Sequence, residues 1–340
     1  MTKKISWLKY FIPLAGLGLA YYLWQQIDSA ELFKSVATPH WKWLMIGFIC
    51  YSVTTYLRAK RWHMLVYPKQ SEVMMMSLTS FHTLLNNVLP ARLGELTYIY
   101  YLKKLGQVSV LTGTATLLIA RFYDLLALIL CFSLGLLWVW TQIQVSLIKF
   151  LIAFVIMVPL FLGILIHFFS STGYARFALG VRRVFNLRSA SLDKILDLGQ
   201  KLVDEMSKIA HGSKRPVLFL FSIGIWLVKN FAFLCILWGV GFNIFTWNNM
   251  LFGSAFSELT TVLPIHGLAG FGTVEGGWTL GFLLLGLPKE LVISSGFAFH
   301  IILLQFSFVI GMFGFIWIYT IGLRKKKSWP STHKVEPITV

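Results

Sequence analysis

Long apolar runs alternate with short polar stretches along almost the whole chain. Because a helix needs about 20 mostly apolar residues to cross the hydrocarbon core of a bilayer, runs of this length indicate membrane spans. Such runs cover residues 6–24, 41–57, 110–140, 147–169, 217–241 and 291–322. The pattern therefore predicts an all-α polytopic membrane protein with about six full transmembrane helices.

Two further apolar segments, residues 73–102 and 248–287, are interrupted by helix-breaking residues. The first contains Leu-Pro-Ala-Arg-Leu-Gly-Glu at residues 89–95, and the second contains a proline, five glycines and a glutamate within residues 263–277. Proline removes a hydrogen bond of the helix, and each glycine weakens a helix by about 1 kcal/mol relative to alanine. Broken backbone at membrane depth persists only where it is buried in protein or lines a wet cavity. We therefore expect both segments to border a working site.

The composition supports a membrane protein, since 57% of the 340 residues are hydrophobic, 13% are charged and the mean hydropathy is +0.72. Soluble domains carry about 25% charged residues. The formal net charge of +17 does not indicate nucleic-acid binding, because Lys and Arg collect in short loops between the apolar runs. The three cysteines lie within apolar runs and lack the spacing of metal ligands or of a disulfide framework. We expect no metal, no cofactor and no nucleic-acid partner.

The distribution of the basic loops predicts the topology. One side of the membrane would hold nearly all Lys and Arg outside the spans, at residues 3–4, 58–69, 103–104, 170–215 and 324–327. The opposite side would keep Lys34, Lys42, Lys149 and Lys289. The positive-inside rule then places both termini in the cytoplasm. Residues 1–323 are expected to form a single transmembrane domain, and residues 324–340 a basic cytoplasmic tail.

This topology makes the two broken segments enter the membrane from opposite sides. Segment 73–102 begins and ends beside cytoplasmic basic residues, whereas segment 248–287 begins and ends on the other side. Each is expected to be a re-entrant hairpin or a pair of short helices, and together they are typical of an inverted repeat. In transporters, such paired interruptions mark a substrate site near the bilayer midplane.

Residues 170–215 form the one sizeable polar segment of the sequence. Within it, apolar residues recur at helical spacing, at Leu192, Ile195, Leu196, Leu202, Val203, Met206 and Ile209. This spacing predicts an amphipathic helix, which we expect to lie in the plane of the cytoplasmic membrane surface. The segment is too short for a nucleotide-binding fold.

Ionisable residues within the apolar segments are the strongest indication of function, because charge at membrane depth costs several kcal/mol without a partner or water. Arg92 and Arg121 are expected to hold a phosphate, since the planar guanidinium stays charged and binds oxyanions bidentately. Glu95, Asp124 and Glu275 would orient these arginines or exchange protons during transport. The predicted substrate-binding residues are Asn86, Asn87, Pro90, Arg92, Gly94, Glu95, Arg121, Asp124, Glu258, Pro264, His266, Gly267, Gly270, Gly272 and Glu275.

Structural explanations stay open for several of these residues. Arg121 and Asp124 are three apart on a helix, so they share a face and could form an ion pair that locks two helices. Lys229 could pair with Glu258 or face water. The glycines of the second broken segment could serve close helix packing instead of a functional break.

Catalytic motifs are missing from the sequence. The chain has no Walker loop for ATP, no His-Glu-x-x-His zinc motif and no Gly-x-Ser-x-Gly nucleophile elbow. His82 and His300 are expected to be packed polar residues rather than ligands, and most tryptophans to be anchors at the membrane interface. Transport is therefore favoured over enzyme activity.

Several motifs, taken in order, are those of one known family. They are Asn86-Asn87-Val88-Leu89-Pro90-Ala91-Arg92-Leu93-Gly94-Glu95, Lys103-Lys104-Leu105-Gly106, Arg121-Phe122-Tyr123-Asp124 and the stretch from Leu263-Pro264 to Glu275. This ordered set resembles the lysylphosphatidylglycerol synthase transmembrane (flippase-like) family over essentially the whole chain. Two positions depart from the family pattern. Ala120 stands where an acidic residue often precedes the Arg-x-x-Asp motif, and His266 stands where proline or glycine is more usual.

The resemblance implies the membrane half of that family, which is associated with moving a modified phospholipid between leaflets. Members that synthesise aminoacylated lipid carry a soluble transferase domain after the membrane region, and this chain stops at Val340, so synthase activity is not implied. The expected function is an ATP-independent lipid translocase of a bacterial inner membrane, which moves a phosphate-bearing or modified lipid, either an anionic phospholipid or a lipid carrier. Two alternatives stay open: an intramembrane transferase acting on a lipid-linked substrate, and a non-catalytic membrane partner of a lipid-modifying enzyme.

Overall fold

The computed structural model describes residues 4–28, 32–33, 36–90, 93–142, 171–185, 190–262 and 268–327. In these residues every regular element is a helix, so the all-α prediction is confirmed. The helices before the polar segment are α1 (Lys4–Trp24), α3 (Trp41–Leu65), α4 (Glu72–Val88), α5 (Gly94–Gly106), α6 (Val110–Val139) and η2 (Trp140–Gln142). The later ones are α8 (Ser171–Phe185), α9 (Ala190–Ile209), α10 (Lys214–Gly239), α11 (Trp247–Val262), η3 (Leu268–Gly270), α12 (Thr273–Leu283) and α13 (Lys289–Lys327).

Three of the described helices are long and apolar enough to cross a membrane: α6, α10 and the Lys289–Thr320 part of α13. Each matches an apolar run that was predicted to be a span, and together they indicate a multi-pass membrane protein. Helices α1 and α3 also cover predicted spans, but α3 carries four basic residues within its length. The predicted span at residues 147–169 lies outside the described part of the chain, so the total of about six spans stays a prediction.

Helix α3 extends beyond the predicted end of its span at residue 57. The sequence placed Arg58 and Arg61 in a basic cytoplasmic loop, whereas the structure continues the helix to Leu65. Arg61 is only 1% exposed. The loop assignment is wrong for these two arginines, because the helix carries both of them and Arg61 has buried partners on two other helices.

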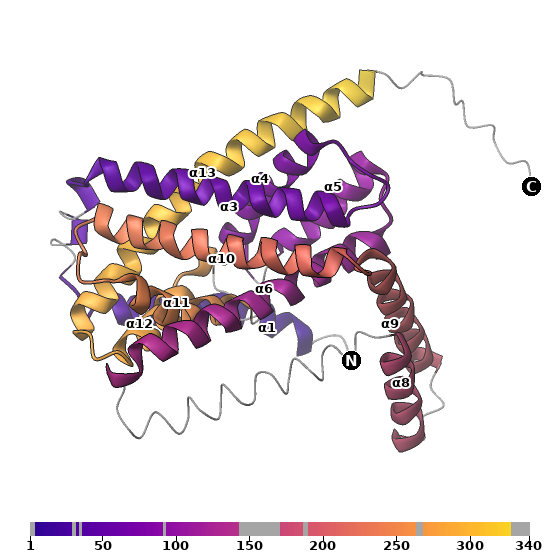
Figure 1. The fold of residues 1–340 in the computed structure, drawn as a ribbon, viewed down its shortest axis with the longest axis horizontal. Helices are drawn as coiled ribbons and strands as arrows, with labels where there is room; N and C mark the ends of the chain where they lie inside the picture. The colour runs from indigo at the N-terminus through magenta and orange to yellow at the C-terminus, as the bar shows by residue number, and fades with distance from the viewer. Residues whose placement is uncertain are drawn as a thin grey trace, which may run out of the picture.

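Helices α3 and α10 lie side by side along the bundle (Figure 1). Gly47 of α3 faces α10 so closely that a Cβ at this position would come within 3.3 Å of the carbonyl oxygen of Ala232. At the other end of α3, Arg61 contacts Ser222 of α10. The two helices therefore run antiparallel, and their close packing fixes which residues of α3 face α10.

The first broken segment consists of α4 and α5, which are joined by residues 89–93, of which 91 and 92 lie outside the described part of the chain. Helix α4 ends where Leu89 becomes extended, because Pro90 disfavours a helical conformation at the preceding residue. Gly94 then starts α5 so close to α4 that a Cβ there would lie 2.4 Å from the backbone nitrogen of Asn86. This pair of short helices agrees with the sequence prediction, while its entry and return through one membrane face stays a prediction.

The second broken segment consists of α11, a break, and α12, with η3 just before α12. Residues 263–267 lie outside the described part of the chain. The two helices pack closely, since a Cβ on Gly281 would lie 2.2 Å from the carbonyl oxygen of Gly253. Gly270 and Gly272 have φ angles of 80° and 82°, which residues with a side chain rarely adopt. This segment touches the first one, because η3 contacts α4.

Helices α8 and α9 form a pair that projects from one end of the bundle, across the direction of α10 (Figure 1). Met206 and Ile209 of α9 lie in the same buried cluster as Leu117 of α6. Thr112 of α6 also donates a 2.7 Å hydrogen bond to Glu205 of α9. The amphipathic helix that was predicted within residues 170–215 is present as α9, and α6 covers part of its apolar face. Its placement in the membrane plane stays a prediction.

Candidate functional site

A cavity of about 280 Å³ lies where the two broken segments approach each other. The last turn of α4 supplies Asn86 and Asn87 to its wall, α11 supplies Ser257 and Glu258, and the first turn of α12 supplies Val274. Helices α3, α6, α10 and α13 supply further lining residues. Both broken helices thus end at one cavity, the arrangement found around substrate sites of transporters with paired interruptions.

Arg61 and Asp124 form a buried ion pair in the wall of this cavity. Nη1 of Arg61 donates to Oδ1 of Asp124 over 2.6 Å, and Nη2 donates to Oδ2 over 2.9 Å. Nη1 also donates to the hydroxyl group of Ser222 over 2.5 Å. Because a bidentate contact fixes the orientation of the guanidinium as well as its position, this pair joins α3, α6 and α10 at one point.

Arg121 lies one turn before Asp124 on α6 and has a different partner. Its Nη2 donates to Oε1 of Glu95 on α5 over 2.7 Å. The direct Arg121–Asp124 pair considered from the sequence is therefore wrong, because each of the two residues reaches a different helix and meets an opposite charge there. The contact through which Glu95 was predicted to orient Arg121 is present.

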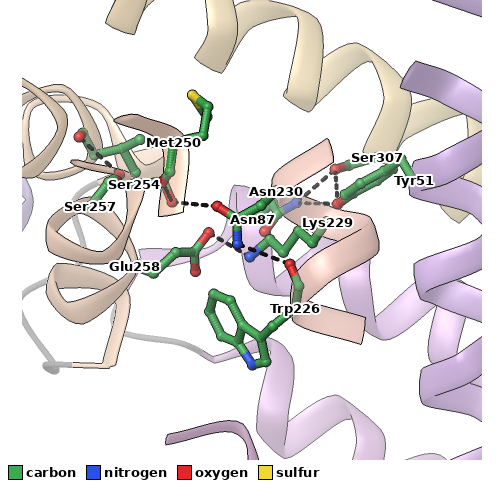
Figure 2. Close-up of polar contacts among 11 residues, drawn as sticks. Tyr51, Asn87, Trp226, Lys229, Asn230, Met250, Ser254, Ser257, Glu258 and Ser307 are labelled. Atoms are coloured by element: carbon green, nitrogen blue, oxygen red, sulfur yellow. Dashed lines mark hydrogen bonds and ion pairs between the residues drawn. The ribbon is translucent and has the colours of Figure 1, made fainter. Parts of the chain in front are cut away.

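Lys229 of α10 donates a hydrogen bond to Oε1 of Glu258 on α11 (Figure 2). Its ammonium nitrogen also lies 4.7 Å from the ring centroid of Trp226, one turn earlier on α10. The ion pair and the cation–π contact together compensate the burial of this lysine. Of the two alternatives for Lys229, pairing with Glu258 is confirmed.

Asn87, in the last turn of α4, is tied to two neighbouring helices. Its Nδ2 donates to Oγ of Ser307 on α13 over 2.6 Å and to the hydroxyl group of Tyr51 on α3 over 3.3 Å (Figure 2). The adjacent Asn86 also lines the cavity, and its buried Oδ1 has no hydrogen-bond partner within the described residues. One asparagine thus anchors the end of α4, while the other offers an acceptor next to the first break.

Glu275 connects the second break to helix α13, although it does not itself line the cavity. Its carboxylate is fully buried, and Oε2 accepts a 2.7 Å hydrogen bond from the backbone N–H of Gly272. The other oxygen, Oε1, lies 2.5 Å from Nδ1 of His300, which lines the cavity. His300 is therefore packed, as predicted, but it also belongs to the cavity wall.

The other predicted site residues fall into two groups. Pro90, Gly94, Gly270 and Gly272 shape the two breaks through their backbone conformation or close approach. The residues outside the described part of the chain, whose placement is therefore untested, are Arg92, Pro264, His266 and Gly267.

Arg58, Arg61, Trp62 and Trp226 are among the cavity-lining residues that were missed from the sequence. The two arginines had been assigned to a loop, and most tryptophans were expected to be anchors at membrane interfaces. The spacing of these residues could have indicated a longer helix. Positions 61 and 62 are three and four residues after position 58, so all three lie near one face of a helix that continues past residue 57.

Comparison with known proteins agrees with this geometry. The chain matches the family described as the lysylphosphatidylglycerol synthase TM region over residues 7–311. It is 29% identical over 242 residues to a UPF0104 membrane protein of Methanocaldococcus jannaschii, an alignment that covers 70% of this chain and 94% of the relative. No solved structure matches the chain. Because the family match includes both broken segments and the cavity residues between them, this membrane protein belongs to the family of the lysylphosphatidylglycerol synthase transmembrane region.

Proposed function

We propose that the protein is an ATP-independent lipid translocase, which moves a phosphate-bearing or modified lipid between the two leaflets of its membrane. The observation that carries this proposal is the cavity between the two broken segments, whose wall combines ion pairs with apolar side chains. A lipid in transit needs such a mixed wall, because its headgroup is polar and its acyl chains are not. The family description, which names a synthase of a phospholipid, supports a substrate of this class.

The apolar part of the wall comes mainly from two helices. Leu118, Leu125 and Leu128 lie on α6, and Leu303 and Leu304 lie on α13. In this proposal the acyl chains lie against these leucines, while the headgroup lies against the charged residues of α3, α6, α10 and α11.

Arg121 is the headgroup-binding residue in this proposal. Its side chain is 33% exposed and lines the cavity, and Glu95 holds it at one nitrogen. A guanidinium has five N–H donors, so the remaining ones can bind a pair of phosphate oxygens. Arg92 stays the second candidate that the sequence suggested.

Alternating access would come from the two broken segments. Their predicted opposite entry lets one segment open the cavity to one leaflet and the other segment open it to the second leaflet. Without ATP, net transfer follows the gradient of the lipid itself.

Purified protein in phosphatidylcholine liposomes with a trace of fluorescent phosphatidylglycerol tests the proposal. Dithionite, which reduces the fluorophore in the outer leaflet, reports how fast labelled lipid arrives from the inner leaflet. Wild-type protein is expected to expose nearly all of the label. Arg121→Ala is expected to slow exchange by a factor of about ten or more, since a hydrogen bond to a charged group is worth about 1.5–3 kcal/mol.

Arg176→Ala is the matched control, because Arg176 is an exposed residue of α8 rather than part of the cavity wall. Arg176→Ala should equal wild type in yield, thermal unfolding and exchange. Because Arg121→Ala also removes the partner of Glu95, its exchange rate is compared at an equal amount of folded, reconstituted protein. Exchange by the wild-type protein no faster than in protein-free liposomes would refute the proposal. A wild-type rate in Arg121→Ala would refute the role given to Arg121.

A further inference from the structure

Within the part of the chain that the structure describes, three buried N–H donors of cavity-lining residues have no acceptor: Nε of Arg61, Nε1 of Trp62 and Nε1 of Trp226. The three residues are 1%, 5% and 6% exposed. Buried donors without an acceptor are destabilising and therefore rare in folded proteins. All three donors belong to residues that line one cavity, so an acceptor bound there can supply the missing partner.

The three donors lie on α3 and α10, and the ring of Trp62 also packs against His82 of α4 and Tyr98 of α5. Arg61 and Trp62 are consecutive on α3, and Trp226 lies one turn after Ser222, the α10 residue that Arg61 contacts. In Figure 2 the indole nitrogen of Trp226 lies at the edge of the ring turned away from the ammonium group of Lys229. The donor of Trp226 is therefore separate from the ion pair of that lysine.

Four lysine and arginine side chains line the cavity, and the ion pairs among the described residues involve three of them. Arg61, Arg121 and Lys229 each have a carboxylate partner. Arg58 also lines the cavity, and no described residue forms a hydrogen bond or an ion pair with it. It lies one turn before Arg61 on α3. An anion near Arg58 would complete the charge balance of the wall.

We propose that Arg58, Nε of Arg61 and the indole groups of Trp62 and Trp226 form a phosphate-binding subsite on the α3–α10 wall, distinct from the Arg121–Glu95 pair. Guanidinium and indole groups donate hydrogen bonds and accept none, so their ligand must be rich in acceptors. A phosphate has several acceptor oxygens and negative charge, and it can therefore satisfy the three donors and Arg58 together. The subsite deepens the proposed function, on which it rests only for the identity of the phosphate-bearing lipid.

Indole N–H resonances provide a direct measurement. Protein with ¹⁵N-labelled tryptophan is kept in dodecyl maltoside micelles, which contain no phosphate. Three probes are titrated: short-chain phosphatidylglycerol, inorganic phosphate, and a short-chain diacylglycerol that lacks phosphate. The variants Trp62→Phe and Trp226→Phe assign the two resonances, because each variant loses one of them.

Both resonances are expected to move downfield on addition of phosphatidylglycerol and to stay in place with diacylglycerol. An equal response to inorganic phosphate would support the subsite and identify the free oxyanion as a sufficient ligand. A response to the lipid alone would support the subsite and show that the acyl chains contribute. Resonances that ignore both phosphate sources, or that move equally with diacylglycerol, would overturn the proposal.

Affinity supplies a second readout. Trp62→Phe and Trp226→Phe keep the ring but remove the donor, so each is expected to weaken phosphatidylglycerol binding about tenfold. Trp41→Phe, at a residue that is 69% exposed, is expected to bind like wild type. Full affinity in both cavity variants would overturn the proposal. If one variant fails to fold, the indole N–H titration of the wild-type protein still tests the subsite.

Binding in micelles is independent of exchange between leaflets. Moving indole resonances without lipid exchange in liposomes would refute the translocase and leave the subsite standing. Lipid exchange without a response of the indole groups would refute the subsite alone.

Discussion

Arg61 and Asp124 are 63 positions apart in the chain, yet their side chains meet in two parallel hydrogen bonds of 2.6 and 2.9 Å. The contact joins the end of α3 that carries the basic cluster to the middle of α6. A buried guanidinium persists there because the carboxylate, together with the hydroxyl group of Ser222, replaces its hydration. The ion pair thus fixes the part of the cavity wall in which Nε of Arg61 has no acceptor among the described residues.

Removal of one partner of this pair should destabilise the protein strongly. Asp124→Leu leaves a buried arginine uncompensated and is expected to lower the free energy of unfolding by about 3 kcal/mol. The double variant Arg61→Met/Asp124→Leu is expected to lose less, because it leaves no buried charge. Denaturant unfolding in detergent measures both. Glu72→Ala, which breaks the exposed pair with Lys60, is the control and should change little.

A double variant that is as unstable as Asp124→Leu would contradict this account. It would show that packing of the two side chains, rather than compensation of charge, holds α3 against α6.

Gly272 should tolerate no side chain, for two separable reasons. Its φ of 82° strains any residue with a Cβ, and a Cβ there would lie 1.8 Å from the carbonyl oxygen of Gly16 on α1. Gly212 has a φ of 52° and open space around the Cβ position, so Gly212→Ala meets only the backbone strain, about 1 kcal/mol. Gly272→Ala adds the clash with α1 and is expected to cost about 3 kcal/mol in thermal unfolding. Equal losses in the two variants would mean that contact with α1 contributes nothing.

The two breaks were predictable because the residues that cause them act locally. Pro90 makes its neighbour Leu89 extended, and Gly270 and Gly272 adopt positive φ within the second break. Such effects depend on a few adjacent residues and need no knowledge of the fold. Helix–break–helix segments are therefore visible in the sequence.

The partner of Asp124 was not predictable in the same way. The Glu95–Arg121 and Lys229–Glu258 contacts were among the expectations, whereas Asp124 pairs with Arg61 of α3, which only tertiary packing brings near. Hydropathy also ends a predicted span at the first cluster of charges, so it could not show that Arg61 is buried on a longer α3. The open indole groups of Trp62 and Trp226 depend on the same packing, and aromatic residues near charges resemble interface anchors in a sequence.

Glu275→Gln should loosen the second break. The carboxylate accepts from the N–H of Gly272 and contacts the ring of His300 with its other oxygen. An amide has one acceptor oxygen and no charge, so it keeps both contacts only by donating to Nδ1 of the other His300 tautomer. We expect a loss of about 2 kcal/mol in stability and faster amide exchange in residues 268–276, measured by hydrogen–deuterium exchange with mass spectrometry. Glu290→Gln, at an exposed residue in the first turn of α13, is the matched control. Unchanged protection of the break would refute its dependence on Glu275.

Glu258→Gln tests how the charge of the cavity governs binding and release. The amide can still accept a hydrogen bond from Lys229, so the contact is kept while one negative charge is lost. Lys229 then adds an uncompensated positive charge to the cavity that receives the phosphate, so phosphatidylglycerol should bind about tenfold more tightly in micelles, a gain of about 1.4 kcal/mol. Exchange in liposomes should become slower, because a more tightly held lipid leaves the cavity less often. Weaker binding in Glu258→Gln would show instead that the phosphate needs the intact Lys229–Glu258 pair, and the site would then centre on α10 and α11 rather than on α3.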